Sequence, residues 1–405
     1  MIAASPRRAD RMAMHTSIGP PSEQPGALTL YPPTRTGRFD VPLDHFRYTP
    51  QSRFHLRFAA YETFAVHHAA PVLFYCGNEG PLELFYNNSG ALFEHAALLG
   101  ARVLFVEHRY YGASLPFGNT SFTNDALQWL TVEQALADYA SCISSLPALL
   151  GCIGTGIRRS AGRCDVVLFG GSYGGMLAAW HRLRYPFLSV GAIASGAPID
   201  FYATNWARHA EEKPVDVQTL FLDAVVNTFE VYGGGRGGCG TALRRALNAV
   251  DNATIEELIV AGVRPCHAWR ADSAERYAFY AKGAIADIAL VDYPYPTNFI
   301  APLPANPVQA ACRVLETRSD ISDAASSAHK LRASTLQSLH RAVLTLVNAS
   351  GDLSCLDLRA ELVGDPSAGQ PTIGRAPASS FQRATVASSD LGVTAWNYQG
   401  KRTAH

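Results

Sequence analysis

The chain has 405 residues, of which 48% are hydrophobic, and its 34 Lys and Arg residues balance 34 Asp and Glu residues. This composition is typical of a globular protein with one large core or two smaller ones, and it is not typical of a disordered chain. A formal net charge of zero, without blocks of like charge, argues against nucleic acid and anionic membrane surfaces as partners. No stretch has the length and apolarity of a membrane span.

The cysteines and sequons favour an oxidising, secretory route. Eight cysteines are spread over the chain without the close pairing of a zinc site, so most are expected in disulfides. Four N-x-S/T sequons, at Asn87, Asn119, Asn252 and Asn348, agree with this route. The N-terminus lacks an apolar signal-peptide region, which predicts that the start of the chain is truncated or misassigned.

The first 200 residues predict alternating strands and helices. Residues 1–39 are rich in Pro, Ser and Arg and are expected to form a leader or loose arm. Strands are then predicted within 54–64, 71–80, 101–112, 164–175 and 190–198, and helices within 89–100, 131–150 and 176–186. This alternation indicates the first part of a parallel α/β core over 40–200.

The sequence pattern changes after residue 200, from alternating strands and helices to mainly helical segments. Helical patterns over 215–232 and 253–263 alternate with a glycine-rich segment and a proline-dense segment, 291–308. They predict a mostly helical insert over 201–395, followed by a short tail over 396–405. No repeat of solenoid period is visible.

One motif carries a specific chemistry. Gly170-Gly171-Ser172-Tyr173-Gly174 follows an apolar strand and precedes an unbroken helix. This is the context of a nucleophile elbow, in which glycines permit a strained turn that lifts the serine hydroxyl above the sheet. The alternative is a purely structural strand-to-helix turn. We interpret Ser172 as the nucleophile.

A nucleophile of this kind needs an oxyanion hole. The backbone N–H of Tyr173 is the first expected donor, and the loop after the strand at 71–76 offers Gly77 and Asn78 for the second, with Gly77 as our candidate. Asn78 and Glu79 of the same loop are candidate substrate contacts, and Glu79 either binds a substrate amine or anchors the loop. No metal or other cofactor is predicted.

Two further polar residues have structural explanations. Cys76 ends an apolar strand and is expected to be a packed small hydrophobe, because nothing nearby signals a stabilised thiolate. His108 precedes the serine, whereas the acid and the base follow it in this kind of hydrolase, so His108 is expected in a buried polar network behind the elbow.

Six longer segments occur in a defined order: "VPLDHF", "FYCGNEG", "FVEHRYYGASLPFGN", "GGSYGGMLAAW", "RYPFLSVGAIASGAPI" and "VDYPYPTNFIAPLPANPV". Together they resemble the lysosomal proline-specific serine peptidases, the family of Pro-X carboxypeptidase and dipeptidyl peptidase II. The resemblance implies an α/β-hydrolase core interrupted by a helical cap, a lysosomal or secreted location, and cleavage of short peptides after Pro or Ala. It also leaves open a homodimer for the complete protein.

The sequence leaves open which branch of the family the chain resembles more, dipeptidyl peptidase II or Pro-X carboxypeptidase. Two segments look like dipeptidyl peptidase II, but its W-D-Y-Q motif reads Trp396-Asn397-Tyr398-Gln399 here. An amide at Asn397 accepts a hydrogen bond from a substrate ammonium without neutralising its charge. The alternatives are therefore dipeptidyl release, slightly favoured, and Pro-X carboxypeptidase activity.

In the family the catalytic Asp and His lie beyond this motif, and the chain ends six residues after Gln399. We therefore expect that the chain is truncated before its triad partners, with very low turnover. Fold order argues against the histidines that do follow Ser172 as its base: His181, His209, His267, His329, His340 and His405. The alternatives to a peptidase are a noncatalytic relative that binds proline-containing peptides and an esterase of the same fold.

Overall fold

The computed structural model describes residues 30–47, 52–151, 164–199, 217–234, 237–316, 328–348, 351 and 353–358. These residues form two compact units, which we call unit 1 (residues 30–199) and unit 2 (residues 217–358). Each unit has its own buried core.

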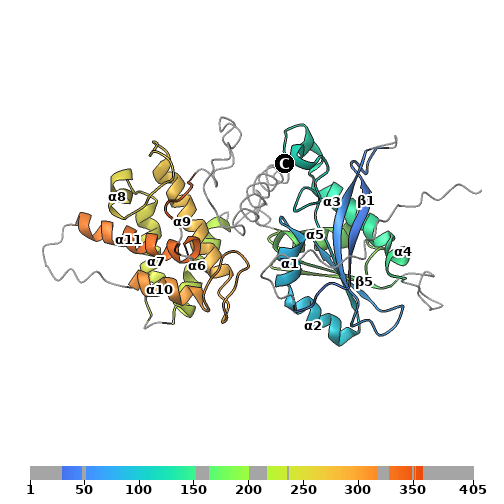
Figure 1. Ribbon diagram of the computed structural model, residues 1–405. Helices are drawn as coiled ribbons and strands as arrows, with labels where there is room; N and C mark the ends of the chain where they lie inside the picture. The colour runs from blue at the N-terminus through green and yellow to red at the C-terminus, as the bar shows by residue number, and fades with distance from the viewer. Residues whose placement is uncertain are drawn as a thin grey trace, which may run out of the picture. The chain divides into compact units, whose positions relative to one another are not determined.

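Unit 1 is built on one six-stranded sheet (Figure 1). The strands are β1 (Arg35–Pro42), β2 (Arg53–Tyr61), β3 (Val72–Cys76), β4 (Arg102–Val106), β5 (Val166–Gly171) and β6 (Gly191–Ser195), in the spatial order β1-β2-β4-β3-β5-β6. β1, β2 and β4 pair antiparallel, whereas β4, β3, β5 and β6 pair parallel. The parallel half brings the carboxyl ends of β3 and β5 to the same edge of the sheet.

Helices cover both faces of this sheet. Leu73 and Tyr75 of β3 face α1 (Leu82–Asn88) and α2 (Gly90–Leu99), whereas Val72 and Phe74 face the other side. That side packs on α3 (Val132–Ser144), α4 (Leu146–Leu150) and α5 (Ser172–Arg184). Because successive side chains of a strand alternate, an apolar run such as "VLFYC" supplies both layers at once. Two 3-10 turns, η1 (Gly118–Thr120) and η2 (Ala126–Trp129), connect β4 to α3. This arrangement is an α/β-hydrolase fold, as expected.

The sheet begins earlier in the chain than expected. β1 begins at Arg35, inside the segment 1–39 that we expected to be a leader, and Tyr31 stacks on Phe93 of α2. Only Phe39 and Val41 of this strand are buried, so its apolar periodicity was too short to recognise. At the opposite side, β6 is the last of the six strands that the structure describes.

Unit 2 is a helical domain. Its helices are α6 (Val217–Tyr232), α7 (Cys239–Val250), α8 (Ile255–Val260), α9 (Ser273–Leu290), α10 (Pro307–Glu316) and α11 (Ala328–Val347). Disulfides join Cys239 to Cys312 and Cys266 to Cys355. Thr254 and Glu257 form a capping box at the start of α8. The proline-dense segment before α10 forms a loop that is closed by paired residues Thr297 and Leu303.

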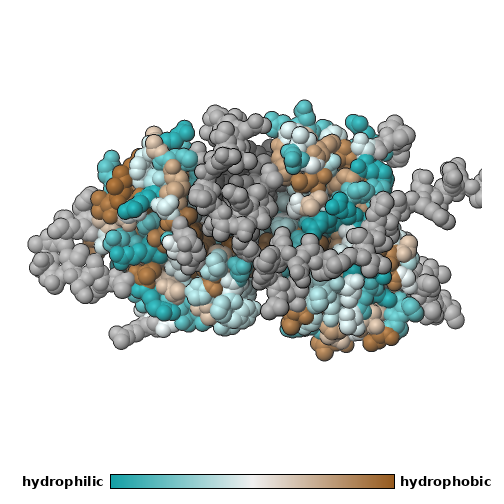
Figure 2. Space-filling model, viewed as in Figure 1, coloured by the Kyte–Doolittle hydropathy of each residue, from teal (hydrophilic) through white to brown (hydrophobic). Residues whose placement is uncertain are grey.

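Hydrophilic and hydrophobic residues are interspersed over the visible surface of each unit (Figure 2). A hydrophobic patch lies where Figure 1 draws α2, whose Leu98 and Leu99 are exposed. Among the described helices, none combines the length and the apolarity needed to cross a membrane.

Candidate active site

Ser172 lies at the turn between β5 and α5, and its backbone is strained. The residue has φ = 52°, in the left-handed region that non-glycine residues rarely adopt. Its side chain is exposed although the residues that follow it in α5, from Tyr173 to Ala178, are buried. The turn therefore presents the hydroxyl at the carboxyl edge of the sheet, as a nucleophile elbow does.

Two glycines of the motif are required by close approach. A Cβ on Gly170 would lie 2.0 Å from the carbonyl oxygen of Gly174, and a Cβ on Gly174 would lie 2.5 Å from Asn78 Oδ1. By contrast, the nearest atom to a Cβ on Gly171 is 3.9 Å away. The spacing G-x-S-x-G thus reflects two positions, Gly170 and Gly174, at which neighbouring atoms leave no room for a side chain.

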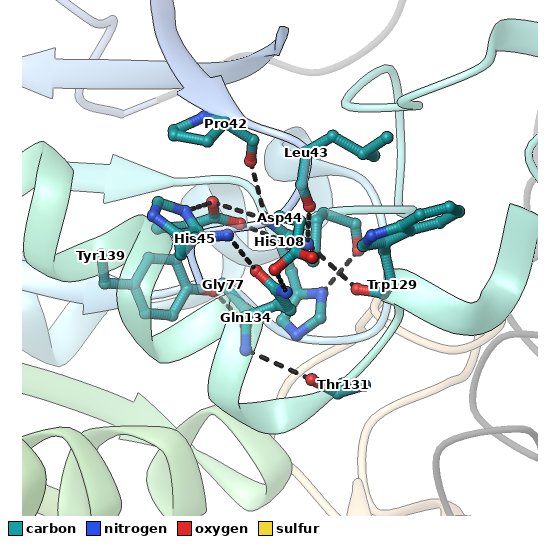
Figure 3. A network of polar contacts seen from close by, with 12 residues as sticks. Pro42, Leu43, Asp44, His45, Gly77, His108, Trp129, Thr131, Gln134 and Tyr139 are labelled. Atoms are coloured by element: carbon teal, nitrogen blue, oxygen red, sulfur yellow. Dashed lines mark hydrogen bonds and ion pairs between the residues drawn. The ribbon is translucent and has the colours of Figure 1, made fainter. Parts of the chain in front are cut away.

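The loop after β3 packs against this elbow. A Cβ on Gly77 would lie 2.4 Å from the carbonyl oxygen of Val106, so only glycine fits there. The Tyr139 hydroxyl donates a hydrogen bond of 3.1 Å to the Gly77 carbonyl (Figure 3). Gly77 is therefore held between the end of β4 and a side chain of α3, beside the end of β5.

Asn78 joins the loop directly to the elbow. Its Nδ2 donates to the carbonyl oxygen of Gly171 at 2.7 Å, and its Oδ1 accepts from the Tyr75 hydroxyl at 2.9 Å. The residue is only 3% exposed. Its side chain is used inside the protein, which differs from the substrate contact that we expected.

Glu79 is a half-buried residue of the same loop, and one of its carboxylate oxygens, Oε2, is buried. Burial raises its pKa, although hydrogen bonds from its own backbone N–H and from Asn78 act in the opposite direction. Its Oε2 is buried and has no hydrogen-bond partner. The local hydrogen bonds support the loop-anchoring alternative, and the unpartnered oxygen leaves one acceptor unused.

Tyr173 is connected to His108 behind the elbow. Its hydroxyl lies 3.1 Å from His108 Nε2, and His108 Nδ1 lies 2.6 Å from the carbonyl oxygen of Arg109. Burial lowers the pKa of His108 to about 4, so the ring is neutral above that pH. The buried polar network predicted for His108 is present.

The next residue, Arg109, is completely buried and forms the centre of the same network. Its Nε and Nη2 donate to the two carboxylate oxygens of Asp138 at 2.6 and 2.8 Å. Its remaining bonds reach the carbonyl oxygens of Pro42, Leu43 and Trp129 (Figure 3). Arg109 lowers the pKa of Asp138 against the opposing effect of burial.

His45 extends the network to the segment after β1. Its Nε2 lies 2.7 Å from Asp138 Oδ1, and its backbone N–H donates to Gln134 Oε1 at 2.9 Å. Gln134 Nε2 in turn donates to Asp44 (Figure 3). Sequence reasoning missed His45, Asp138 and Tyr139, because side chains 29 to 93 residues apart meet here without any local spacing signal.

Within unit 1, no described residue forms a hydrogen bond with Ser172 Oγ. His181 is buried in α5, and neither of its ring nitrogens has a hydrogen-bond partner. In unit 2, His267 pairs with Asp357, and the Tyr277 hydroxyl lies 3.0 Å from His340 Nδ1. The side chains of His209, His329 and His405, and Asn397, lie outside what the structure describes.

Cys76 and Cys142 are free and buried, and burial raises the pKa of the Cys76 thiol, which agrees with its expected packing role. The described residues contain no group of three or more His, Cys, Asp or Glu side chains that could hold a metal ion.

Comparison with known proteins identifies a family that this chain matches. The sequence profile described as serine carboxypeptidase S28 matches residues 41–362. Human lysosomal Pro-X carboxypeptidase is 31% identical over 366 residues, which cover 89% of this chain and 62% of the relative. The bovine protein of the same name is 31% identical over 95% of this chain and 68% of its own length.

Thymus-specific serine protease of the mouse is 34% identical over 45% of this chain and 33% of that protein. The chain thus spans only 62% of the length of relatives such as the human carboxypeptidase. Among solved structures, proline iminopeptidase from Mycobacterium smegmatis aligns over 66% of this chain and 74% of that one, with a TM-score of 0.31 and 14% identity, too low to support a conclusion. On the family profile and the bovine relative, the chain belongs to the serine carboxypeptidase S28 family.

Proposed function

We propose that this protein is a serine exopeptidase in which Ser172 attacks short peptides after proline or alanine. The observation that carries the proposal is the backbone of Ser172, held at φ = 52° with an exposed side chain at the carboxyl edge of the sheet. Such strain is typical of functional sites, and in this fold it belongs to the nucleophile.

In the proposed reaction the Ser172 hydroxyl adds to the substrate carbonyl and its proton passes to a general base. The backbone N–H groups of Tyr173 and Gly77 bind the oxyanion that forms. The protonated base then gives this proton to the leaving amine as the C–N bond breaks. Water, losing a proton to the same base, hydrolyses the acyl-enzyme and releases the acid, and the proton returns to Ser172. None of the described histidines of unit 1 is proposed as this base.

The end of the peptide from which residues are removed is proposed from the relatives. The names of the human and bovine proteins describe carboxypeptidases that act at Pro-X bonds, so we favour removal of the residue after proline. Unit 2, together with neighbouring residues of the predicted insert, is proposed as the cap that limits access to short peptides. Glu79 and Asn397 stay candidates for a substrate ammonium in the dipeptidyl alternative.

Labelling with a fluorophosphonate tests the nucleophile. We expect the probe to modify Ser172, identified by peptide mass spectrometry, and we expect no modification of Ser172→Ala. Labelling of another residue, or equal labelling of Ser172→Ala, would refute the assignment. A folded wild-type chain that binds Pro-containing peptides but resists the probe would favour a binding protein without turnover.

Blocked substrates test the direction. Acetyl-Ala-Pro-Phe should be cleaved as readily as its free-amine form, and amidation of its C-terminus should abolish cleavage. The opposite pattern, in which acetylation abolishes cleavage and amidation does not, would establish dipeptidyl release. An esterase would instead hydrolyse simple esters and neither peptide.

A lysosomal or secreted location is part of the proposal. It is supported by the two disulfides of unit 2 and by the exposure of three sequon asparagines, Asn87, Asn119 and Asn252. Treatment of the secreted or lysosomal protein with peptide N-glycosidase should lower its apparent mass. An unchanged mass would contradict glycosylation at these sites.

A further inference from the structure

The buried contact between His108 and Tyr173 has a defined polarity. The carbonyl oxygen of Arg109 only accepts hydrogen bonds, so the proton of the neutral imidazole lies on His108 Nδ1, 2.6 Å from that oxygen. Nε2 is then an acceptor, and the Tyr173 hydroxyl, 3.1 Å away, must donate to it. Burial, which lowers the pKa of His108 to about 4, keeps this arrangement at higher pH.

We propose that His108 is a positioning residue of the oxyanion hole, because its Nε2 fixes the Tyr173 side chain and thereby the backbone N–H that follows the nucleophile. The inference rests on the proposed function of Ser172. It assigns a role in reactivity to a residue that the proposed chemistry does not otherwise use.

The position of Tyr173 makes this connection direct. Tyr173 is in the first turn of α5, where backbone N–H groups point away from the helix and are used to bind anions. Its ring is buried, 5.5 Å from the His108 ring between centroids. A ring fixed at its far end by a hydrogen bond limits rotation of the backbone at its near end.

His108 is itself held by its neighbours. It lies two residues after the end of β4, and its ring packs edge-on against Tyr111 at 5.1 Å between centroids. Arg109, whose carbonyl accepts from the His108 ring, is fixed by Asp138 and by three backbone carbonyls. The acceptor for the Tyr173 hydroxyl therefore stands on a rigid support, as positioning of a donor requires.

Two variants separate the two hydrogen bonds of His108. His108→Gln places an amide oxygen near the position of Nε2 and so keeps an acceptor for Tyr173, but it loses the bond to the Arg109 carbonyl. His108→Asn places an amide nitrogen near the position of Nδ1 and so keeps the bond to Arg109, but it loses the acceptor. Tyr173→Phe removes the donor alone.

The measurement is the rate of Ser172 modification by a fluorophosphonate, resolved into probe affinity and maximal rate, because phosphonylation places an oxygen in the oxyanion hole. Loss of one oxyanion donor costs about 100-fold to 1000-fold in rate, so its misplacement should cost about 10-fold or more. We expect this loss of maximal rate in His108→Asn and Tyr173→Phe, with probe affinity unchanged. His108→Gln should retain most of the rate.

The double variant His108→Asn with Tyr173→Phe should be no slower than Tyr173→Phe alone, because both changes remove one interaction. Unfolding midpoints of all variants report stability separately. Equal rates in wild type and His108→Asn would overturn the inference, as would equal losses in the Gln and Asn variants. If wild-type Ser172 does not react at all, the proposed function fails and the positioning role fails with it.

Discussion

Removal of the Asp138 carboxylate should be among the most destabilising single changes in unit 1. Asp138→Ala leaves the fully buried Arg109 guanidinium without its two charge-assisted bonds, of 2.6 and 2.8 Å, and also removes a partner of His45. Bonds to charged groups contribute about 1.5 to 3 kcal/mol each, and breaking a buried ion pair costs about 3 to 5 kcal/mol. We therefore expect a loss of about 4 kcal/mol.

Urea unfolding followed by tryptophan fluorescence and circular dichroism measures this loss. The matched control is Asp40→Ala, which breaks the pair with Arg53, whose side chain is 41% exposed. That pair lies on the same sheet, and exposed pairs contribute about 1 kcal/mol or less. Equal effects of the two substitutions would refute the reasoning that burial makes the Arg109–Asp138 pair important.

Two other perturbations have defined outcomes. Gly174→Ala places a Cβ 2.5 Å from Asn78 Oδ1, so it should abolish probe labelling of Ser172 and lower the free energy of unfolding by about 1 to 3 kcal/mol. Gly171→Ala is the matched control, because the nearest atom to its Cβ is 3.9 Å away, and it should change neither property. Equal effects of the two substitutions in labelling and melting assays would contradict the steric argument. Burial lowers the pKa of His181 from 6.5 to about 4, so the fold favours the neutral ring and loses up to about 3 kcal/mol as pH falls from 6.5 towards 4. His108 acts in the same direction, so His181→Leu should reduce but not remove this pH dependence in urea unfolding, and an unchanged dependence would show that His181 is not its source.

The central strands and the nucleophile could be predicted because their signals are local. The apolar runs before Gly77 and before Gly170 are short, β-rich and followed by glycine, and both form the strands expected of them. The elbow at Ser172 is encoded in five consecutive residues. By contrast, β1 begins before its first buried residue, Phe39, so periodicity could not locate its start.

The partners of the supporting network from other parts of the chain could not be predicted, because they form pairs that are distant in sequence. Asp138 and Tyr139 read as ordinary residues of an amphipathic helix, yet one binds Arg109 and the other binds the Gly77 carbonyl. Asn78 was a candidate substrate contact because it lies in the loop after the strand at 71–76. The sequence does not show that its amide bonds to both Gly171 and Tyr75.

The left-handed backbone of Ser172 has a consequence for attempts to stabilise this protein. Glycine adopts φ = 52° without the strain of about 1 to 2 kcal/mol that a residue with a Cβ carries there. A redesign that matches each residue to its backbone conformation would therefore replace the serine with glycine, and the resulting variant should unfold at a higher temperature. At this position the backbone conformation favours glycine, but the hydroxyl of Ser172 should be kept because the proposed chemistry depends on it.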